Sequence, residues 1–373
     1  MSAAARHLLQ KLLDTADLRL DGDRPWDIRL HDSGLPRRLL AGGSLALGDS
    51  YVEGAWDCAA LDECFHRLLG AWLDERVPSA GRLADSLKAR LLNMQSLRRA
   101  RAGARHHYDI GNDLYEAMLD PRMIYSCAWW EAGAATLEEA QEAKLELCCR
   151  KLGLRPGQRL LDIGCGWGGL ARWAAERHGV QVVGITLAER QAELARERCR
   201  GLPVEIRLED YRRLEGSFDH VVSVGMFEHV GWRNHRAFFL AVRRLLREDG
   251  LLLLHTIGGN RSVHHTDPWI GRHIFPGSML PSAAQITAAA EGLLVLEDWH
   301  SFGPDYDRTL MAWHANCERA WPRLDGQRYD ERFRRMWRYY LLSCAGAFRA
   351  RRNQLWQLVF SPRGRPGGYR SVR

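Results

Sequence analysis

A glycine-rich loop that follows a short apolar strand constrains this chain more than any other feature. Residues 160–169 read LLDIGCGWGG, in which apolar residues lead to Asp162 and then to glycines at 164, 166, 168 and 169. The next segment, 170–178, has the composition of a helix. Glycine between a strand and a helix lets backbone N–H groups approach a ligand closely. The segment therefore predicts a ligand-binding turn in an α/β sheet.

The position of the acidic residue separates two classes of ligand. A dinucleotide-binding loop reads G-x-G-x-x-G, and its acidic residue follows about 20 residues later. Here Asp162 precedes the first glycine, and the spacing is D-x-G-x-G-x-G. This order resembles the S-adenosylmethionine loop of Rossmann-like methyltransferases. A chance glycine-rich turn is the alternative when the motif is taken alone.

Composition limits the class of protein. The length of 373 residues suggests one large domain and a smaller one. A hydrophobic content of 46% and a charged content of 27% are ordinary for a soluble globular protein. The sequence has no run of about 18 apolar residues and no recognisable secretion signal. We therefore expect a cytoplasmic protein without a membrane-spanning helix.

Cysteine spacing and net charge bear on cofactors and partners. Nine cysteines are present without a C-x-x-C pair or a Cys/His cluster of zinc spacing, so we expect reduced thiols and no metal. The net charge is +7, and lysine occurs only at 11, 88, 144 and 151, so arginine carries nearly all of the positive charge. Coding bias explains most of this pattern, yet a basic surface also favours an anionic partner, either lipid or nucleic acid.

Hydrophobic periodicity divides the chain into three parts. Residues 1–80 mix a short amphipathic helix with strand-like and turn-rich pieces such as 42–54, which predicts a small α+β domain. The resemblance described below implies that this domain faces the lipid. In 81–105, leucines at near-helical spacing are surrounded by arginines, which predicts a basic helical linker. The linker fits either a solvated surface or a contact with phospholipid headgroups. Residues 106–373 are expected to form the methyltransferase catalytic domain.

From about residue 137 the sequence predicts a regular α/β core. Near-continuous apolar strands alternate with helices, a pattern typical of a parallel sheet covered on both faces. The expected fold class is therefore α/β, with a Rossmann-like class I methyltransferase sheet, helices on both of its faces and a small α+β N-terminal domain. The expected strands lie at 159–164, 181–186, 204–210, 220–226 and 251–257, and further strands are plausible at 293–300 and 354–361.

Six strings along the chain carry a more specific resemblance than the glycine loop. Together they are similar to bacterial cyclopropane-fatty-acyl-phospholipid synthases, S-adenosylmethionine-dependent enzymes of the mycolic acid cyclopropane synthase-like family. The stretches 42–58 and 106–119 extend the resemblance over most of the chain. The strings are YSCAWW (125–130), LDIGCGWGG (161–169), VSVGMFEHVG (222–231), LLHTIG (253–258), PDYDRTLMAW (304–313) and CAGAFRAR (344–351).

The resemblance implies chemistry on a membrane lipid. The π electrons of a cis double bond in a phospholipid acyl chain would attack the methyl group of S-adenosylmethionine, and the added methyl would lose a proton as a cyclopropane ring closes. An alkene is a poor nucleophile and the cation is easily trapped by water, so the pocket should be dry and apolar. Candidate wall residues, each of which also fits an ordinary core position, are Trp129, Trp130, Phe227, Trp269 and Phe275.

The same family implies a bound bicarbonate ion as the base, because an isolated anionic side chain is costly in an apolar pocket. By matching motif, Glu228 would hold the protonated oxygen, and His255 and Tyr306 would donate to the others. Cys127 and the backbone of Ile257 would complete the cage. Without the family, His255 fits a core histidine and Tyr306 a surface aromatic.

Cys344 is an obvious nucleophile candidate, because it is one of the three thiols within the strings that carry the resemblance. Its surroundings, however, are those of a buried amphipathic helix, where a thiol behaves as a small apolar group. Direct methyl transfer to an alkene also requires no covalent enzyme intermediate. A structural role is therefore the alternative for Cys344.

The donor site follows from matching motifs and from strand topology. A hydroxyl and an amide at Thr186 and Gln191 can bind a ribose diol, and Asp210 ends a strand where a carboxylate commonly accepts the adenine amine. The full candidate set is Tyr125, Ser126, Leu161, Asp162, Ile163, Gly164, Cys165, Gly166, Trp167, Gly168, Gly169, Thr186, Leu187, Gln191, Asp210 and Tyr211.

Two other functions stay open on the sequence alone. A relative could form a methyl-branched lipid or methylate a small amine, and a silent module could bind lipid or nucleic acid. The intact loop and cage argue against a silent module, and no aromatic-basic strand motif of RNA-binding proteins is present. We expect a phospholipid partner, peripheral contact with the inner face of the membrane and no nucleic acid. A homodimer is compatible with the sequence.

Overall fold

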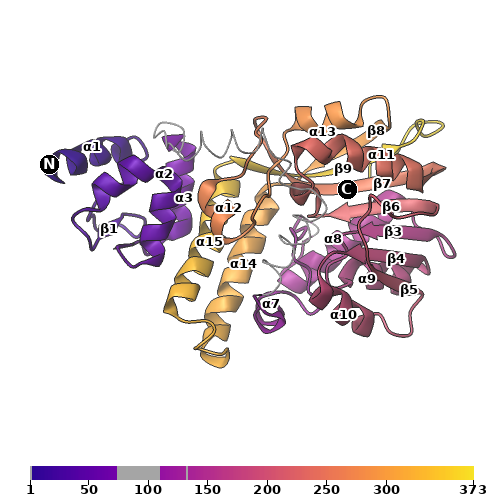
Figure 1. Ribbon diagram of the computed structural model, residues 1–373, viewed down its shortest axis with the longest axis horizontal. Helices are drawn as coiled ribbons and strands as arrows, with labels where there is room; N and C mark the ends of the chain where they lie inside the picture. Colours follow the sequence, from indigo (N-terminus) through magenta and orange to yellow (C-terminus); the bar gives the residue numbers. More distant parts are fainter. Residues whose placement is uncertain (1, 74–109, 132) are drawn as a thin grey trace. The chain divides into compact units, whose positions relative to one another are not determined.

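The computed structural model of the protein describes residues 2–73, 110–131 and 133–373. The predicted basic linker at 81–105 lies outside these described residues. The chain divides into two compact units, which are described separately below. Figure 1 follows the chain from its N-terminus in indigo to its C-terminus in yellow.

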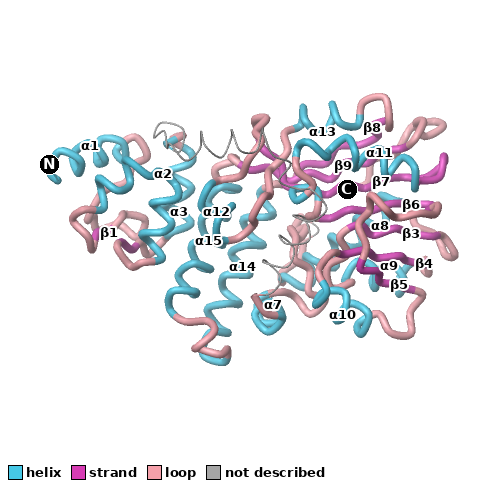
Figure 2. The backbone as a smooth tube through the Cα atoms, in the orientation of Figure 1, coloured by secondary structure: helices cyan, strands magenta, loops and turns pink. Residues whose placement is uncertain are grey.

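The larger unit is built on a mixed sheet, which has seven strands in the described part of the chain (Figures 1 and 2). The strand order is β5-β4-β3-β6-β7-β9-β8. The pairs that join β3 to β4, β4 to β5, β3 to β6 and β6 to β7 are parallel, whereas β8 is antiparallel to β9. The strands are β3 (Arg159–Ile163), β4 (Gln181–Thr186), β5 (Val204–Leu208), β6 (Phe218–Val224), β7 (Leu246–Gly259), β8 (Val295–Ser301) and β9 (Asn353–Ser361).

The antiparallel pair is formed by the two further strands, for which the sequence predicted no direction. The strands predicted at 293–300 and 354–361 lie close to the observed β8 and β9. An apolar run predicts a buried strand, but it does not indicate whether the strand pairs parallel or antiparallel with its neighbour. Direction depends on the connection between the strands, which here contains α14 (Pro304–Ala320) and α15 (Glu331–Arg349). The positions of these strands therefore followed from the sequence, whereas the antiparallel pairing of β8 with β9 did not.

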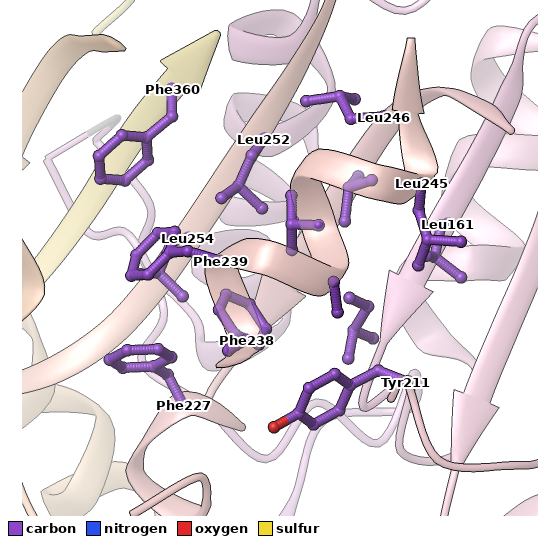
Figure 3. Close-up of a cluster of buried hydrophobic side chains, with 14 of the residues drawn as sticks. Leu161, Tyr211, Phe227, Phe238, Phe239, Leu245, Leu246, Leu252, Leu254 and Phe360 are labelled. Carbon is purple, nitrogen blue, oxygen red and sulfur yellow. The ribbon is translucent and has the colours of Figure 1, made fainter. Parts of the chain in front are cut away.

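Alternate residues of the strands supply a separate core on each face of the sheet. Leu161 and Leu252 join a cluster that includes Phe238 and Phe239 of α11 (Figure 3). Their neighbours Leu160 and Leu251 join the opposite cluster. This alternation follows from the two-residue period of a strand. The helices of this unit are α7 (Asn112–Met118), α8 (Leu137–Leu152), α9 (Gly169–His178), α10 (Glu189–Arg198), α11 (His235–Leu245) and α13 (Ala283–Ala290).

Helix α8 is well delimited by its sequence. The Thr136 side chain accepts a hydrogen bond from the Glu139 backbone N–H, and the Glu139 side chain accepts one from the Thr136 N–H. The helix ends at Gly153, whose φ of 61° is the left-handed conformation that glycine adopts without strain. Such a capping box fixes where the helix begins, and thereby which side chains of α8 face the sheet.

The smaller unit combines residues 2–73 with His265–Pro276 and Tyr306–Asn353. Close backbone approaches join these segments, since a Cβ at Gly346 would lie 2.6 Å from the Asp62 carbonyl oxygen. The predicted division into 1–80, 81–105 and 106–373 is sequential, whereas these contacts unite segments far apart in the chain. The elements of this unit are α1 (Ser2–Asp14), β1 (Arg29–Leu30), α2 (Leu35–Val52), β2 (Trp56–Asp57), α3 (Leu61–Gly70), α12 (Pro268–His273), α14 and α15.

One predicted segment of the smaller unit has a different structure. Most of the strand-like stretch 42–54 lies in α2, which is kinked at Gly43 with a φ of 56°. The alternating Leu45 and Leu47 suggested a strand, but two adjacent glycines permit the kink that lets a helix continue past them. Of the helices in the described ranges, none is both long and apolar enough to cross a membrane.

Candidate active site

The glycine loop has the conformation that its spacing predicts. Gly164, Gly166 and Gly168 have φ angles of 85°, 55° and 82°, in the left-handed region that favours glycine. The N–H groups of Gly164 and Cys165 donate to the Ile185 carbonyl at 2.9 and 3.0 Å. The loop is therefore fixed to β4 at the carboxyl end of the parallel strands, the edge where such sheets bind ligands.

Two glycines of the loop are required for different reasons. A Cβ at Gly166 would meet no atom of the described residues within 4 Å other than its chain neighbours, so this part of the backbone borders open space. A Cβ at Gly169 would lie 2.6 Å from the Arg122 carbonyl oxygen and 2.3 Å from Ile124 Cδ1. Gly166 thus leaves room for a ligand, whereas Gly169 permits close packing at the start of α9.

Asp162 is a buried carboxyl group with an unusual environment. Its Oδ2 atom has no hydrogen-bond partner among the described residues. Burial raises its pKa to about 7, and the positive charge of Lys144 opposes this shift. A buried polar atom without a partner is rare and is often found at a functional site. Asp162 therefore fits a donor-binding role.

Lys144 is a residue of this site that sequence reasoning missed. It lies on α8 and is only 1% exposed, and its Nζ donates to Ser126 Oγ at 2.8 Å. Burial lowers its pKa. Lys144 therefore links two predicted donor-site residues, Ser126 by a hydrogen bond and Asp162 by charge. The sequence could have pointed to Lys144, because lysine is scarce in this arginine-rich chain and two of the lysines lie in the α8 segment.

Aromatic contacts place the 125–126 segment beside the glycine loop. The Tyr115 ring lies 5.2 Å from the Tyr125 ring and 4.9 Å from the Trp167 ring, measured between centroids. The Gln141 side chain donates to the Ser126 carbonyl at 2.8 Å. Tyr125, Ser126 and Trp167 were predicted from separate strings, and the structure brings them together.

Thr186 and Gln191 also come together. Their side chains are joined by a hydrogen bond of 3.0 Å between Thr186 Oγ1 and Gln191 Oε1, and Leu187 between them is half-buried. A hydroxyl paired with an amide is the combination expected for a ribose diol. Thr186 ends β4 and Gln191 lies in the first turn of α10, which places both at the same sheet edge as the glycine loop.

Several candidate donor-site side chains have partners within the protein. Asp210 accepts hydrogen bonds from the Arg212 side chain at 2.8 and 2.7 Å, one on each carboxylate oxygen. The side chains of Leu161, Ile163 and Tyr211 belong to the hydrophobic core. Figure 3 shows the Tyr211 ring next to Phe238. Leu161 and Ile163 therefore offer a donor only their backbone.

Glu228 lies just beyond β6 in the short helical turn η1 (Phe227–His229). Its Oε1 accepts a hydrogen bond of 2.7 Å from the Ile257 N–H. Its Oε2 is buried and has no partner in the described part of the chain. Burial raises the pKa of this carboxyl group to about 7. The Ile257 backbone N–H, which the resemblance places in the cage, thus holds Glu228.

His255 lies on β7 opposite Val224 of β6, and its carbonyl accepts from the Gly225 N–H at 2.9 Å. Its Nδ1 is 3.2 Å from Gln357 Nε2, and its buried Nε2 has no partner among the residues described. Burial, together with the positive charges of Lys144 and Lys151, lowers its pKa well below the ordinary value. The ring is therefore neutral, and one of its nitrogens is free for a ligand.

Cys127 belongs to a segment that lies near the end of β6. A Cβ at Gly225 would lie 3.8 Å from the Ser126 Cβ, which places the 126–127 segment beside the end of β6. The Cys127 Sγ is buried and lies 3.1 Å from the Ala128 carbonyl oxygen. Cys127, Glu228 and His255 thus all belong to segments that meet at this end of the sheet.

The remaining candidates, Tyr306 and Cys344, belong to the smaller unit. The Tyr306 ring packs 4.7 Å from the Phe348 ring. Asp305, which precedes it, accepts a hydrogen bond of 2.6 Å from the Trp130 N–H within the larger unit. Cys344 lies on α15, where burial raises its pKa to about 12. A thiol with so high a pKa is a poor nucleophile at neutral pH.

This high pKa leads to a contrast between two serine variants. Cys344→Ser should retain most of its turnover, whereas Cys127→Ser should lose about tenfold, equivalent to one altered polar contact near the reaction. Lipid turnover by each purified variant measures the difference, with circular dichroism as the control for folding. A folded but inactive Cys344→Ser protein would instead support a covalent enzyme intermediate.

The proposed aromatic wall is largely occupied by ordinary packing. Phe227 stacks on His235 with centroids 4.4 Å apart and belongs to the core cluster (Figure 3). Trp269 packs 4.4 Å from Tyr339 in the smaller unit. The core interpretation therefore accounts for these two residues. Within the described ranges, no group of His, Cys, Asp and Glu side chains is arranged to hold a metal ion.

Comparison with known proteins identifies the family of this chain. The family model for mycolic acid cyclopropane synthetase matches residues 95–358. The cyclopropane-fatty-acyl-phospholipid synthase of Escherichia coli strain K12 is 50% identical over 369 residues, which cover 98% of this chain and 95% of that protein. The tuberculostearic acid methyltransferase of Mycobacterium tuberculosis is 35% identical over 356 residues, 89% of this chain and 82% of that protein.

A solved structure of a mycolic acid cyclopropane synthase, complexed with SAH and CTAB, also matches. It is 34% identical with a TM-score of 0.63, and the match covers 70% of this chain and 97% of that one. The class I methyltransferase fold and the resemblance drawn from the six strings are both confirmed. The chain belongs to the mycolic acid cyclopropane synthetase family.

Proposed function

We propose that this protein is a cyclopropane-fatty-acyl-phospholipid synthase that uses bicarbonate as the base. It would transfer a methylene group, derived from the S-adenosylmethionine methyl, to a cis double bond in a phospholipid acyl chain. The observation that carries the proposal is the pair of buried polar atoms Glu228 Oε2 and His255 Nε2, which have no partner among the described residues. Such atoms are costly to bury unless a ligand satisfies them.

The two side chains suit a small oxyanion that carries one proton. With a pKa of about 7, Glu228 is present in both protonation states near neutral pH, so it can hold a proton between two oxygens. The neutral His255 ring can donate a single N–H. Bound bicarbonate would supply a base that a dry pocket otherwise lacks. Cys127 and Tyr306 are proposed to complete its surroundings.

The donor would be held by the loop from Asp162 to Gly169, by Tyr125 and Ser126, and by the Thr186–Gln191 pair. Bound S-adenosylmethionine supplies an electrophilic methyl group. The open space at Gly166 lets the backbone approach the donor, and the buried charge of Asp162 suits its cationic amino group. These features support donor binding at the carboxyl edge of β3 and β4.

Two measurements test the proposal. Mass spectrometry of phospholipids from cells that express the protein should show acyl chains heavier by one methylene, with loss of the olefinic NMR signals and appearance of cyclopropane signals. Turnover in bicarbonate-free buffer should fall and be restored by added bicarbonate. Equal turnover in both buffers would contradict the assignment of the base.

A methyl-branched product is the second candidate, favoured by the similarity to the tuberculostearic acid methyltransferase. The same lipid analysis separates the two functions, because a branched chain carries no cyclopropane signals. The presence of Glu228 and His255 together favours proton removal and hence ring closure. Methylation of a small amine would leave the acyl chains unchanged.

Access to the acyl chain requires contact with the inner face of the membrane, and the protein would act as a cytoplasmic, peripherally bound enzyme. Exposing each methylene of a lipid to water costs about 0.8 kcal/mol, so the chain should pass directly from bilayer to pocket. We propose the basic segment 81–105 as the docking element, although it lies outside the described residues.

Replacing Arg98, Arg99 and Arg101 with glutamine should weaken sedimentation with anionic vesicles and lower lipid turnover. The attraction of basic side chains to anionic headgroups is screened within about 8–10 Å, so the difference should shrink as salt is added. Donor affinity serves as the control and should not change. Equal sedimentation of variant and wild type at low salt would rule out this segment.

A further inference from the structure

Gln357 is a buried polar residue that the proposed reaction does not yet use. It lies on β9, which neighbours β7 in the sheet (Figure 1). Its side chain is 0% exposed, and its Nε2 is 3.2 Å from His255 Nδ1 and 3.4 Å from Cys148 Sγ. An amide that is fully buried beside a candidate catalytic histidine bears directly on where that histidine carries its proton.

A neutral imidazole has one donor nitrogen and one acceptor nitrogen. In the amide orientation of the structure, Gln357 Nε2 lies next to His255 Nδ1, and in this orientation Nδ1 would accept a hydrogen bond and carry no hydrogen. The ring proton must then reside on Nε2, the buried atom that has no partner among the described residues. The opposite amide orientation would place the ring proton on Nδ1 and make Nε2 an acceptor. Cys148 Sγ, which lies beside the same amide nitrogen, can accept its second hydrogen.

We propose that Gln357 is a positioning residue that holds His255 in the tautomer protonated on Nε2, so that the ring presents an N–H donor to an anion in the site. The identity of that anion rests on the proposed function. The tautomer itself does not, because it is a property of the free protein. Without the amide donor, the ring would populate both tautomers, and in one of them its open nitrogen would repel an anion.

Nitrogen NMR of protein labelled with ¹⁵N-histidine tests the proposal directly. The chain has 15 histidines, and a spectrum of His255→Gln identifies the His255 signals by their loss. In the wild type, Nε2 should resonate as a protonated nitrogen and Nδ1 as an unprotonated one. In Gln357→Met, which keeps the side-chain length and removes the donor, both resonances should move toward the average of the two tautomers.

Gln354→Met is the matched control, because it makes the same change on the same strand. Gln354 bonds to Asn260 Oδ1 at 3.1 Å, and its substitution should leave the His255 resonances unchanged. Gln357→Met should also lower kcat about tenfold at unchanged KM for the donor, the effect of one weakened hydrogen bond at the reacting site. A purely structural role would lower stability without moving the tautomer.

A wild-type spectrum with the proton on Nδ1 would overturn the proposal, and so would a Gln357→Met spectrum identical to the wild type. If Gln357→Met does not fold, the wild-type spectrum still decides which nitrogen is protonated. Failure of the bicarbonate proposal is distinguishable, because it would appear as turnover independent of bicarbonate while the tautomer result stands.

Discussion

Replacing Glu228 with glutamine is expected to lower kcat by roughly 10²–10³-fold, the effect of losing one preorganised polar group at a reacting centre. The Oε1 atom can still accept from the Ile257 N–H after the substitution, so the local structure should persist. What is lost is the ability to exchange a proton near neutral pH. Donor affinity, measured by calorimetry, should stay within about twofold, because the substitution alters the cage and leaves the loop unchanged.

The same substitution should stabilise the fold at neutral pH. Burial raises the Glu228 pKa from 4.5 to about 7, so the folded state disfavours the ionised form. The wild type therefore loses stability as pH rises from about 4.5 to 7, whereas the glutamine variant does not. Above pH 7 the variant should be more stable by roughly 3 kcal/mol, and near pH 4 the difference should vanish.

Urea denaturation of both proteins at pH 5 and pH 8 measures this gap. Glu215→Gln is the matched control, because Glu215 is exposed and the same chemical change there should alter neither stability nor turnover. A Glu228→Gln protein with wild-type turnover, or with no gain in stability at pH 8, would contradict the role assigned to this carboxyl group.

Gly166→Val is expected to weaken S-adenosylmethionine binding by at least about 100-fold, or roughly 2.7 kcal/mol. Apart from its chain neighbours, no atom of the described residues lies within 4 Å of a Cβ at this position, so the branched side chain would occupy the space assigned to the donor. Valine is also unfavourable at a φ of 55°, which adds a cost of about 1–3 kcal/mol to the fold.

Gly201→Val separates the two effects. Gly201 has a φ of 83° and a Cβ there would also meet no atom within 4 Å, but the turn is remote from the loop in the sequence. Both variants should lose similar stability in thermal unfolding, and only Gly166→Val should lose calorimetric donor binding. Equal donor affinity of the two variants would remove the loop from the binding site.

The parts of the site that were predictable share one property: they are encoded locally. The left-handed glycines at 164, 166 and 168 follow from their spacing, and the positions of Thr186 at the end of β4 and of His255 within β7 follow from apolar runs. Gln357 was not predictable in this way. It lies 102 residues from His255 in the chain, and only the strand order brings the two together.

The same limit explains the errors in the fold. The helix over most of 42–54 was read as strand-like because Leu45 and Leu47 alternate, and the compact unit that contains it depends on contacts with α15. The hydrophobic periodicity of a sequence does not indicate packing between segments that are far apart in the chain. The direction of β8 against β9 depends in the same way on a connection that the strand residues do not encode.

The two buried lysines of α8 restrict how this chain can vary. Lys144 and Lys151 are each 1% exposed, and Lys151 Nζ lies 3.0 Å from His300 Nδ1. Elsewhere nearly every basic position is an arginine, which an exposed position accommodates as readily as a lysine. At these two positions arginine cannot substitute, because a guanidinium is larger and keeps its charge when buried, whereas an amine can release its proton. A genome that exchanges lysine for arginine at the surface would therefore retain lysine here.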